Sequence, residues 1–264
     1  MTLATNSSTA VDPALTMARQ ALYRFAALSL LDPREGTWQE LSGLRENSLL
    51  QDAALLIRSL PEVSTAELGF GEQPIELLEP QKVLAYLPES EQALNKLYEN
   101  TFGLLVSSNC PPYEMEYVHS KFTFQRSNTL ADITGYYHAF GLTVSDKLPE
   151  RPDHIVLELE FMASLLGLQR QAASSESPSA AAQQQVCRDA QLSFLREHLA
   201  WWVPAFCMLL EKQSDGGFYT AASKFLAAFL AAERAVLGLP SASRPITPSL
   251  EERPEICEGC QLAG

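Results

Sequence analysis

The sequence has few basic residues. Its 264 residues include 19 Lys and Arg against 32 Asp and Glu, which gives a formal net charge of −13 at pH 7. Proteins that bind nucleic acid neutralise its phosphates with clustered Lys and Arg, so this balance argues against a nucleic-acid partner. It favours a basic partner and disfavours an anionic lipid surface.

Long apolar runs and a secretory signal are also lacking. No segment reaches the roughly 18 consecutive apolar residues that a membrane-spanning helix needs, so no stable membrane insertion is expected. The N-terminal stretch MTLATNSSTAVDP has no basic segment followed by an apolar one, unlike a secretory signal peptide. The five cysteines are scattered, and their odd number does not suggest a disulfide framework. A cytoplasmic protein with reduced thiols is the simplest interpretation.

Motifs of several enzyme classes are missing as well. The chain has no Gly-rich phosphate loop of the Walker type, no Gly-x-Ser-x-Gly and no dinucleotide-binding fingerprint. Metal phosphohydrolases place His before Asp and use further His residues, whereas this chain has Asp153 before His154 and only four His. The residues therefore indicate a protein without a cofactor and without a visible catalytic constellation.

The chain does contain helical periodicity, with no convincing strand. Asp12 can cap a helix that Pro13 starts, and Asp32-Pro33 ends it. Further helices are expected at about 37–45, 48–59, 76–87, 89–106, 127–140, 154–170, 186–212 with an interruption at Pro204, and 218–237. This pattern predicts an all-α protein, a single compact bundle of about nine or ten helices that occupies residues 1–238.

Three stretches differ in character from the rest. The pattern at 154–170 is apolar nearly all round, so we expect this helix at the centre of the core. Residues 172–185, AASSESPSAAAQQQ, lack large apolar side chains and are expected to form an exposed flexible linker. Such a linker would permit a homodimer by domain exchange. Residues 239–264 contain four prolines and are expected to form an irregular tail that carries Cys257 and Cys260.

Two short motifs have the spacing of metal ligands. Glu116 and His119 match the Glu-x-x-His spacing of di-iron bundles, but such sites need a second pair, and no second Glu-x-x-His occurs. Cys257 and Cys260 form a lone Cys-x-x-Cys near the C-terminus, whereas a structural zinc site needs four ligands. No metal site is therefore expected, although the cysteine pair leaves open a protein that delivers metal or iron–sulfur groups.

The cluster Glu150-Arg151-Pro152-Asp153-His154 directly precedes the apolar helix at 154–170. In the simplest interpretation Asp153 is the helix N-cap and His154 is a solvated residue of the first turn. Alternatively, the cluster is a pH-responsive or peptide-binding site, because His titrates near neutrality and carboxylates bind basic peptides. An enzymatic acid–base pair is the least favoured alternative. Spacing alone favours the cap.

Five segments, in the order in which they occur, resemble the TorD/DmsD family of redox-enzyme maturation chaperones, which serve molybdenum enzymes. The segments are Leu97-Tyr98-Glu99-Asn100-Thr101-Phe102-Gly103, Pro111-Pro112-Tyr113-Glu114, Asp132 to Leu142 with Tyr136-Tyr137-His138-Ala139-Phe140-Gly141, Glu150 to His154, and Phe194 to Phe206. Proline stands at position 152, one place later than in the usual family signature. The CEGC tail is not a general feature of the family.

The resemblance implies an all-helical, non-enzymatic cytoplasmic chaperone. Members of the family bind the twin-arginine signal peptide of a molybdopterin-containing oxidoreductase, or its apo-form, and hold it until the cofactor is inserted, which prevents premature export. The implied partner is thus an apo-molybdoenzyme catalytic subunit. Acidic side chains would pair with arginine, and aromatic ones would pack on the apolar part of the peptide. The implied binding residues are Tyr98, Phe102, Tyr113, Glu114, Glu150, Asp153 and His154.

Overall fold

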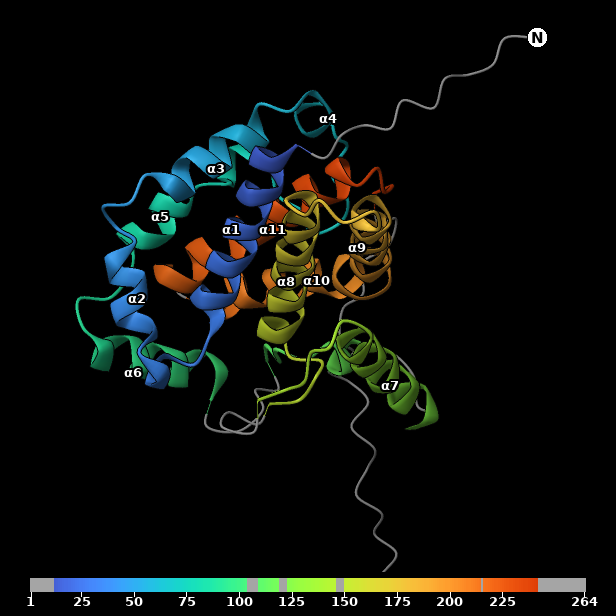
Figure 1. Ribbon diagram of the computed structural model, residues 1–264. Coiled ribbons are helices and arrows are strands. Elements are labelled where there is room, and N and C mark those ends of the chain that lie inside the picture. Colours follow the sequence, from blue (N-terminus) through green and yellow to red (C-terminus); the bar gives the residue numbers. More distant parts are fainter. Residues whose placement is uncertain (1–11, 104–108, 119–122, 146–149, 215, 242–264) are drawn as a thin grey trace, which may run out of the picture.

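Helices α1 (Pro13–Leu30) and α8 (Ile155–Ala173) pack side by side at the centre of the protein (Figure 1). The computed structural model describes residues 12–103, 109–118, 123–145, 150–214 and 216–241. In chain order, the other elements are η1 (Pro33–Glu35), α2 (Thr37–Gly43), α3 (Leu49–Arg58), α4 (Pro61–Ser64), η2 (Ile75–Leu77), α5 (Pro80–Ala85), α6 (Glu91–Phe102), η3 (Glu114–Tyr117), α7 (Thr123–Ala139), α9 (Ala180–Phe194), η4 (Leu195–Leu199), α10 (Ala200–Gln213) and α11 (Phe218–Val236).

The all-α prediction is confirmed, since the described ranges form helices and contain no strand. None of the helices in these ranges has the length and apolar character needed to cross a membrane. Helix α1 starts where the sequence predicts, because the Asp12 carboxylate accepts hydrogen bonds from backbone N–H groups of the first turn. Further along α1, the Gln20 amide donates to the carbonyl oxygen of Ala163 in α8 at 3.1 Å.

Helix α8 is buried on most sides, as its apolar sequence predicts. Phe161 packs edge-on against Phe194 of α9, with ring centroids 4.6 Å apart. On the other side of the core, Tyr23 of α1 meets Phe229 of α11 with centroids 4.7 Å apart. Aromatic pairs of this geometry contribute about 0.5–1.5 kcal/mol beyond the burial of their area. These contacts join the early and late helices of the chain into one core.

The stretch 172–185 is largely exposed, as predicted, but most of it is helical, and the linker is shorter than expected. Helix α8 continues to Ala173 and α9 begins at Ala180, which leaves only residues 174–179 between them. Alanine and glutamine have high helix propensity, so the low-complexity stretch is compatible with a helix. Buried residues later in α9 attach that helix to the core, which the composition of the stretch itself does not reveal.

Other predicted helices also have different bounds, and the one expected at 127–140 begins earlier, at Thr123. The helix expected at 76–87 is divided into η2 and α5, with Pro80 at the first position of α5. The helix expected at 89–106 ends at Phe102, where Gly103 adopts φ 76°. Most of the predicted tail, residues 242–264, lies outside the described residues.

Pro204 does not interrupt the helix in which it lies. It is buried inside α10, shortly after the π-helical turn η4. A proline inside a helix removes a backbone hydrogen bond, and its ring crowds the carbonyl group four residues earlier. The segment around Gly71 packs closely against Pro204. A Cβ at Gly71 would lie only 2.9 Å from the Pro204 carbonyl oxygen. Gly71 also has φ +74°, which favours glycine.

Helix α7 lies at one end of the protein (Figure 1). Two tyrosines attach it to the rest of the chain. The Tyr137 hydroxyl donates to the carbonyl oxygen of Pro152 at 2.8 Å, and the Tyr136 ring packs on Phe194 with centroids 5.3 Å apart. Helix α7 is thereby held beside the segment that precedes α8.

Candidate functional site

Two segments far apart in the sequence are joined at the entrance to α8. The backbone N–H of Ile155 donates to the Pro112 carbonyl oxygen at 2.9 Å, and the N–H of Glu114 donates to the Asp153 carbonyl oxygen at 3.0 Å. Together these hydrogen bonds form an isolated antiparallel bridge. The loop before η3 and the residues before α8 therefore form one surface.

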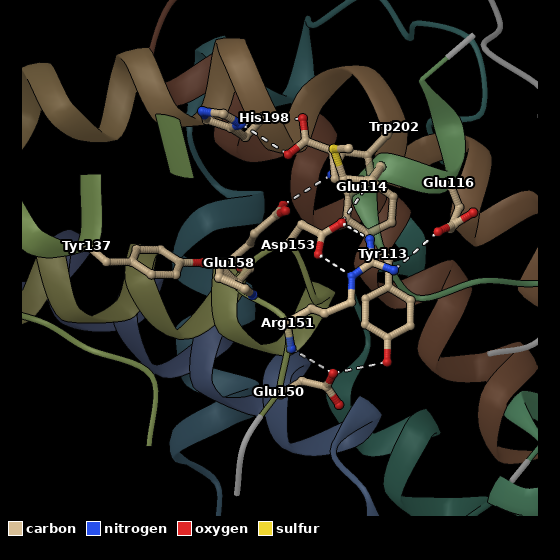
Figure 2. A network of polar contacts seen from close by, with 12 residues as sticks. Tyr113, Glu114, Glu116, Tyr137, Glu150, Arg151, Asp153, Glu158, His198 and Trp202 are labelled. Carbon is tan, nitrogen blue, oxygen red and sulfur yellow. Dashed lines mark hydrogen bonds and ion pairs between the residues drawn. The ribbon is translucent and has the colours of Figure 1, made fainter. Parts of the chain in front are cut away.

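Arg151 connects the side chains of these two segments (Figure 2). Its guanidinium group forms two parallel hydrogen bonds with Asp153, Nε to Oδ1 at 3.0 Å and Nη2 to Oδ2 at 2.7 Å. Its Nη1 donates to Glu116 Oε1 at 3.2 Å, and its Cζ lies 4.4 Å from the centroid of the Tyr113 ring. An arginine that is both bidentate and stacked has a well-defined position.

Asp153 is not the N-cap of α8, contrary to the sequence-based expectation. Its side chain is fully buried and accepts a hydrogen bond from the backbone N–H of Met115 at 3.1 Å, in addition to those from Arg151. The N-cap is His154, whose Nδ1 accepts from the Val156 N–H at 3.3 Å. The Asp153 carboxylate thus holds η3 against the start of α8.

His154 is buried, with 5% of its surface exposed, and is not the solvated residue that the cap interpretation predicts. Burial lowers the pKa of its imidazole to about 4; the Arg151 charge also lowers it, while Glu150 and Asp32 oppose the shift. Its ring packs edge-on against Tyr113, with centroids 5.1 Å apart. The imidazole is therefore neutral at pH 7.

Glu150 and Tyr113 form the outer part of this surface. The Tyr113 hydroxyl donates to Glu150 Oε1 at 3.0 Å, and the same oxygen accepts from the backbone N–H of Arg151 at 2.8 Å. Glu150 is exposed and Tyr113 is partly exposed. A carboxylate and an aromatic ring are thus presented to solvent side by side.

Glu114 lies behind this surface in a second set of contacts, visible in Figure 2 beside His198. Only 1% of Glu114 is exposed. Its Oε2 lies 3.1 Å from His198 Nδ1, and its Oε1 accepts from the indole N–H of Trp201 at 2.8 Å. Glu114 therefore links η3 to the π-helical turn η4 and to α10.

Tyr98 and Phe102 come from α6 and pack against Tyr219 of α11. The rings of Tyr98 and Phe102 are 4.9 Å apart, and those of Phe102 and Tyr219 are 5.2 Å apart. Burial raises the pKa of the Tyr98 hydroxyl, and Tyr113 and Glu150 are among the groups that raise it further. The partly exposed Tyr98 therefore lies near the outer surface, whereas Phe102 belongs to the core.

The structure thus separates the seven predicted binding residues into two groups. The first group reaches solvent and contains Tyr98, Tyr113 and Glu150. The second group is buried beneath or beside it and contains Phe102, Glu114, Asp153 and His154.

Comparisons with known proteins agree with the family that the sequence motifs resemble. A family model described as "Nitrate reductase delta subunit" matches residues 76–208, about half of the chain. The chain is also 31% identical over 183 residues to the chaperone protein TorD of Photobacterium profundum, a match that covers 67% of this chain and 81% of that protein. The chain belongs to the TorD family.

Two further relatives of this TorD-family protein have names that specify an enzyme. It is 34% identical over 113 residues to the selenate reductase assembly chaperone protein of Thauera selenatis, covering 43% of this chain and 55% of that protein. It is 38% identical over 86 residues to the chlorate reductase assembly chaperone protein of Ideonella dechloratans, covering 33% and 42% respectively. The match spans about half of the length of each of these two relatives.

One buried carboxyl group of this TorD-family protein was missed by the sequence analysis. Glu158 is completely buried in α8, and its Oε2 accepts from the indole N–H of Trp202 at 3.1 Å. Burial raises its pKa well above the usual value, and the nearby Glu114 carboxylate raises it further. Both effects favour the protonated form of this carboxyl group. The signal was present, because Glu158 is an acidic residue among apolar neighbours in a helix expected to be central.

The metal-ligand motifs are not completed in the part of the TorD-family chain that the structure describes. Glu116 pairs with Arg151. Its predicted partner His119, and the pair Cys257 and Cys260, lie outside the described residues. Within those residues, no group of three or more His, Cys, Asp or Glu is placed to hold a metal ion.

Proposed function

We propose that this TorD-family protein is a cytoplasmic chaperone that binds the twin-arginine signal peptide, or the apo-form, of a molybdopterin-containing oxidoreductase. It assists cofactor insertion, prevents premature export and catalyses no reaction itself. The names of its relatives support this proposal, because they specify chaperones, two of them for the assembly of a reductase.

The observation that carries the proposal is the contact between the two signature segments at the entrance to α8. The backbone bridge and the Arg151–Asp153 ion pair hold Tyr113 and Glu150 in position. Groups that are already ordered lose little conformational entropy when a partner binds. The protein therefore has a rigid support for a carboxylate and an aromatic ring at its surface.

A twin-arginine signal peptide has the complementary groups, namely two adjacent arginines and an apolar stretch. The Glu150 carboxylate can accept charge-assisted hydrogen bonds from a guanidinium group. The rings of Tyr113 and Tyr98 can pack on a guanidinium plane or on apolar side chains. The net charge of −13 attracts a cationic peptide over a longer range. In this proposal Phe102, Glu114, Asp153 and His154 support the surface from within.

Calorimetric titration with a synthetic twin-arginine signal peptide tests the proposal. A matched peptide in which glutamine replaces both arginines is the control. We expect the native peptide to bind at least tenfold more tightly than the control, and its affinity to fall as salt is raised from 0.05 to 0.5 M, roughly the range over which screening becomes strong. Equal affinity for the two peptides, or no binding of either, would contradict the proposed function.

A further inference from the structure

A small cavity of about 30 Å³ lies between η1 and α6, next to the proposed binding surface. Its lining includes Asp32, Arg34, Tyr98 and Glu99. Tyr98 belongs to the proposed surface as well. Burial raises the pKa of the Tyr98 hydroxyl, and the Asp32 and Glu150 carboxylates both raise it further. Asp32 is therefore close to the proposed surface, although the proposed function does not use it.

An arginine of the protein itself is bound to Asp32. The Arg34 Nε donates to Asp32 Oδ1 at 2.9 Å and to Oδ2 at 3.0 Å, and Nη2 donates to Oδ2. The backbone N–H of Arg34 donates to Oδ1 at 3.1 Å, so the same carboxylate also caps η1. Planar contacts of this kind, with two nitrogens on both carboxylate oxygens, are how carboxylates recognise arginine. The Asp32 carboxylate is thus positioned to accept a guanidinium group.

The ion pair between Arg34 and Asp32 is only loosely held. The Arg34 side chain is 67% exposed, whereas that of Asp32 is 26% exposed. Exposed ion pairs contribute little to stability, so this one can open at small cost. Hydrogen bonding to Asp32 raises the pKa of Arg34, and the Glu99 carboxylate in the lining of the same cavity adds to this effect. Arg34 can therefore leave Asp32 and still have a carboxylate nearby.

The cavity favours a ligand that brings hydrogen-bond donors. Besides the two carboxylates, its lining contains Asn95 Oδ1, a buried acceptor without a hydrogen-bond partner among the described residues. Buried acceptors are normally paired with a donor. A guanidinium group is cationic and carries only donors, and it can stack on an aromatic ring such as that of Tyr98. The lining thus has the same preference that the bound Arg34 shows.

Two adjacent arginines are bound best by two separate carboxylates. Successive side chains of an extended peptide point to opposite faces, so neighbouring arginines do not readily reach the same group. Glu150 and Asp32 can be these two carboxylates. Burial lowers the pKa of His154, and both carboxylates oppose this shift, which places both of them close to the same imidazole.

We propose that Asp32 binds one of the two adjacent arginines of the client, and that Arg34 occupies this position in the free protein. The client arginine replaces the Arg34 guanidinium on Asp32, and Arg34 moves to Glu99. This inference rests on the proposed function, because it assigns a binding position to one arginine of the signal peptide. Arg34 is then an internal competitor that lowers the affinity for the client.

The first test removes the competitor. In Arg34→Gln, the native twin-arginine peptide should bind at least about threefold more tightly than in the wild type, which corresponds to the loss of one exposed ion pair. Lys82→Gln is the matched control, because it removes the same charge from another exposed ion pair, with Glu79, outside the cavity. Weaker binding to Arg34→Gln, or an equal change in the two variants, would overturn the inference.

The second test removes the carboxylate. Asp32→Asn keeps a side chain that can cap η1, and it should bind the native peptide at least about fivefold more weakly, with the glutamine-substituted control peptide unaffected. In this background Arg34→Gln should no longer tighten binding, because there is no carboxylate to compete for. Glu62→Gln is the matched control, since Glu62 is exposed on α4, at the other end of the protein from α6 (Figure 1). Unchanged affinity of Asp32→Asn for the native peptide would contradict the assignment.

The third test does not depend on a signal peptide. Arginyl-arginine amide is titrated into protein labelled with ¹⁵N at arginine, and the Nε resonance of Arg34 is followed by NMR. We expect a saturable shift in the wild type and in Glu62→Gln, and none in Asp32→Asn. Lysyl-lysine amide has the same charge without the planar fork, so at least about fivefold more of it should be needed. An equal response to the two amides, or no shift in the wild type, would count against an arginine position at Asp32.

The three tests separate the inference from the proposed function. If the native peptide does not bind the wild type but arginyl-arginine amide displaces Arg34, the proposed function fails and the arginine position at Asp32 stands. If the peptide binds, but Arg34→Gln behaves like Lys82→Gln and Arg34 does not respond to the amide, the inference fails alone. Failure of the peptide to bind and of Arg34 to respond overturns both proposals.

Discussion

Arg151 and Asp153 form a bidentate ion pair whose carboxylate is fully buried, with Nη2 2.7 Å from Oδ2. The same carboxylate accepts the backbone N–H of Met115, so the pair fastens η3 to the start of α8. Asp153, one of the two acidic residues of the Glu150–His154 cluster, thus has its partners inside the protein. Glu150 is the carboxylate of that cluster that reaches solvent.

Replacing Arg151 with methionine tests this role. The apolar stem is kept, but Asp153 loses its partner while it stays buried. Removing one member of a buried pair typically costs about 3–5 kcal/mol. Because the Arg151 side chain is 38% exposed, we expect a smaller loss, about 2 kcal/mol, in the free energy of unfolding measured with denaturant. Arg151→Lys, which keeps the charge but not the fork geometry, should lose less. Wild-type stability in Arg151→Met would show that the pair does not hold the loop.

His154 gives a pH dependence that can be measured. Burial lowers the pKa of its folded-state imidazole from 6.5 to about 4. Between these values the unfolded chain binds a proton that the folded protein does not bind. The contribution of His154 to stability is therefore complete above pH 6.5 and declines as the pH falls toward 4, by at most about 1.4 kcal/mol per pH unit.

The matched variant for this prediction is His154→Asn, since asparagine can still cap a helix but does not titrate. Carboxyl groups elsewhere titrate in both proteins, so the informative quantity is the difference between their free energies of unfolding. We expect this difference to change by at least about 1 kcal/mol in favour of the variant between pH 7 and pH 5. A constant difference over that range would mean that His154 is not held neutral.

Glu158 should show the opposite pH dependence. Burial and the nearby Glu114 raise its folded-state pKa well above 4.5, so the unfolded chain loses the proton at lower pH than the folded protein does. The stability that Glu158 contributes is complete below pH 4.5 and is lost as the pH rises toward its folded-state pKa. Glu158→Gln removes this loss while keeping an acceptor for Trp202. We expect Glu158→Gln to gain stability relative to the wild type between pH 4.5 and pH 8. A relative loss on raising the pH would contradict a raised pKa of Glu158 in the folded protein.

The central helix could be predicted from the sequence because apolar residues on nearly all sides of a helix have few places other than a core. The length of the linker could not be predicted correctly. Residues 180–185 have the composition of an unstructured segment, but they form the first turns of α9, whose later turns are packed on the core. Sequence patterns give only the helix propensity of a segment, and here the tertiary contacts of α9 determine that residues 180–185 are helical.

The candidate site shows the same limit at the level of single residues. Capping rules favour Asp153 over His154 as the N-cap, yet Arg151 and Met115 bind the Asp153 carboxylate and leave the cap to the imidazole. The pairing of Glu114 with His198 depends on distances between elements, which no local pattern contains. The motif order singled out this region of the chain as the candidate site, and the fold decided which of its side chains are buried.

Tyr98 and Phe102 should respond differently to truncation. Phe102 is 5% exposed and packs on Tyr219, so Phe102→Ala should lower the free energy of unfolding by about 3 kcal/mol. Tyr98 is partly exposed, so Tyr98→Ala should cost less stability, about 1–2 kcal/mol, and weaken binding of the signal peptide. Denaturant unfolding measures the first effect and calorimetry the second. If Tyr98→Ala were the more destabilising variant, the assignment of Phe102 to the core and Tyr98 to the surface would be wrong.

The most direct test of the proposed binding surface is charge reversal at Glu150. The affinity of the purified protein for a twin-arginine signal peptide is measured for the wild type, for Glu150→Lys and for Glu62→Lys, which makes the same charge change on the distant α4. We predict that Glu150→Lys weakens binding by about tenfold or more, corresponding to the loss of at least one charge-assisted contact, and that Glu62→Lys changes it less than twofold. Equal affinities for Glu150→Lys and Glu62→Lys, with both proteins folded, would contradict a client-binding surface at the entrance to α8.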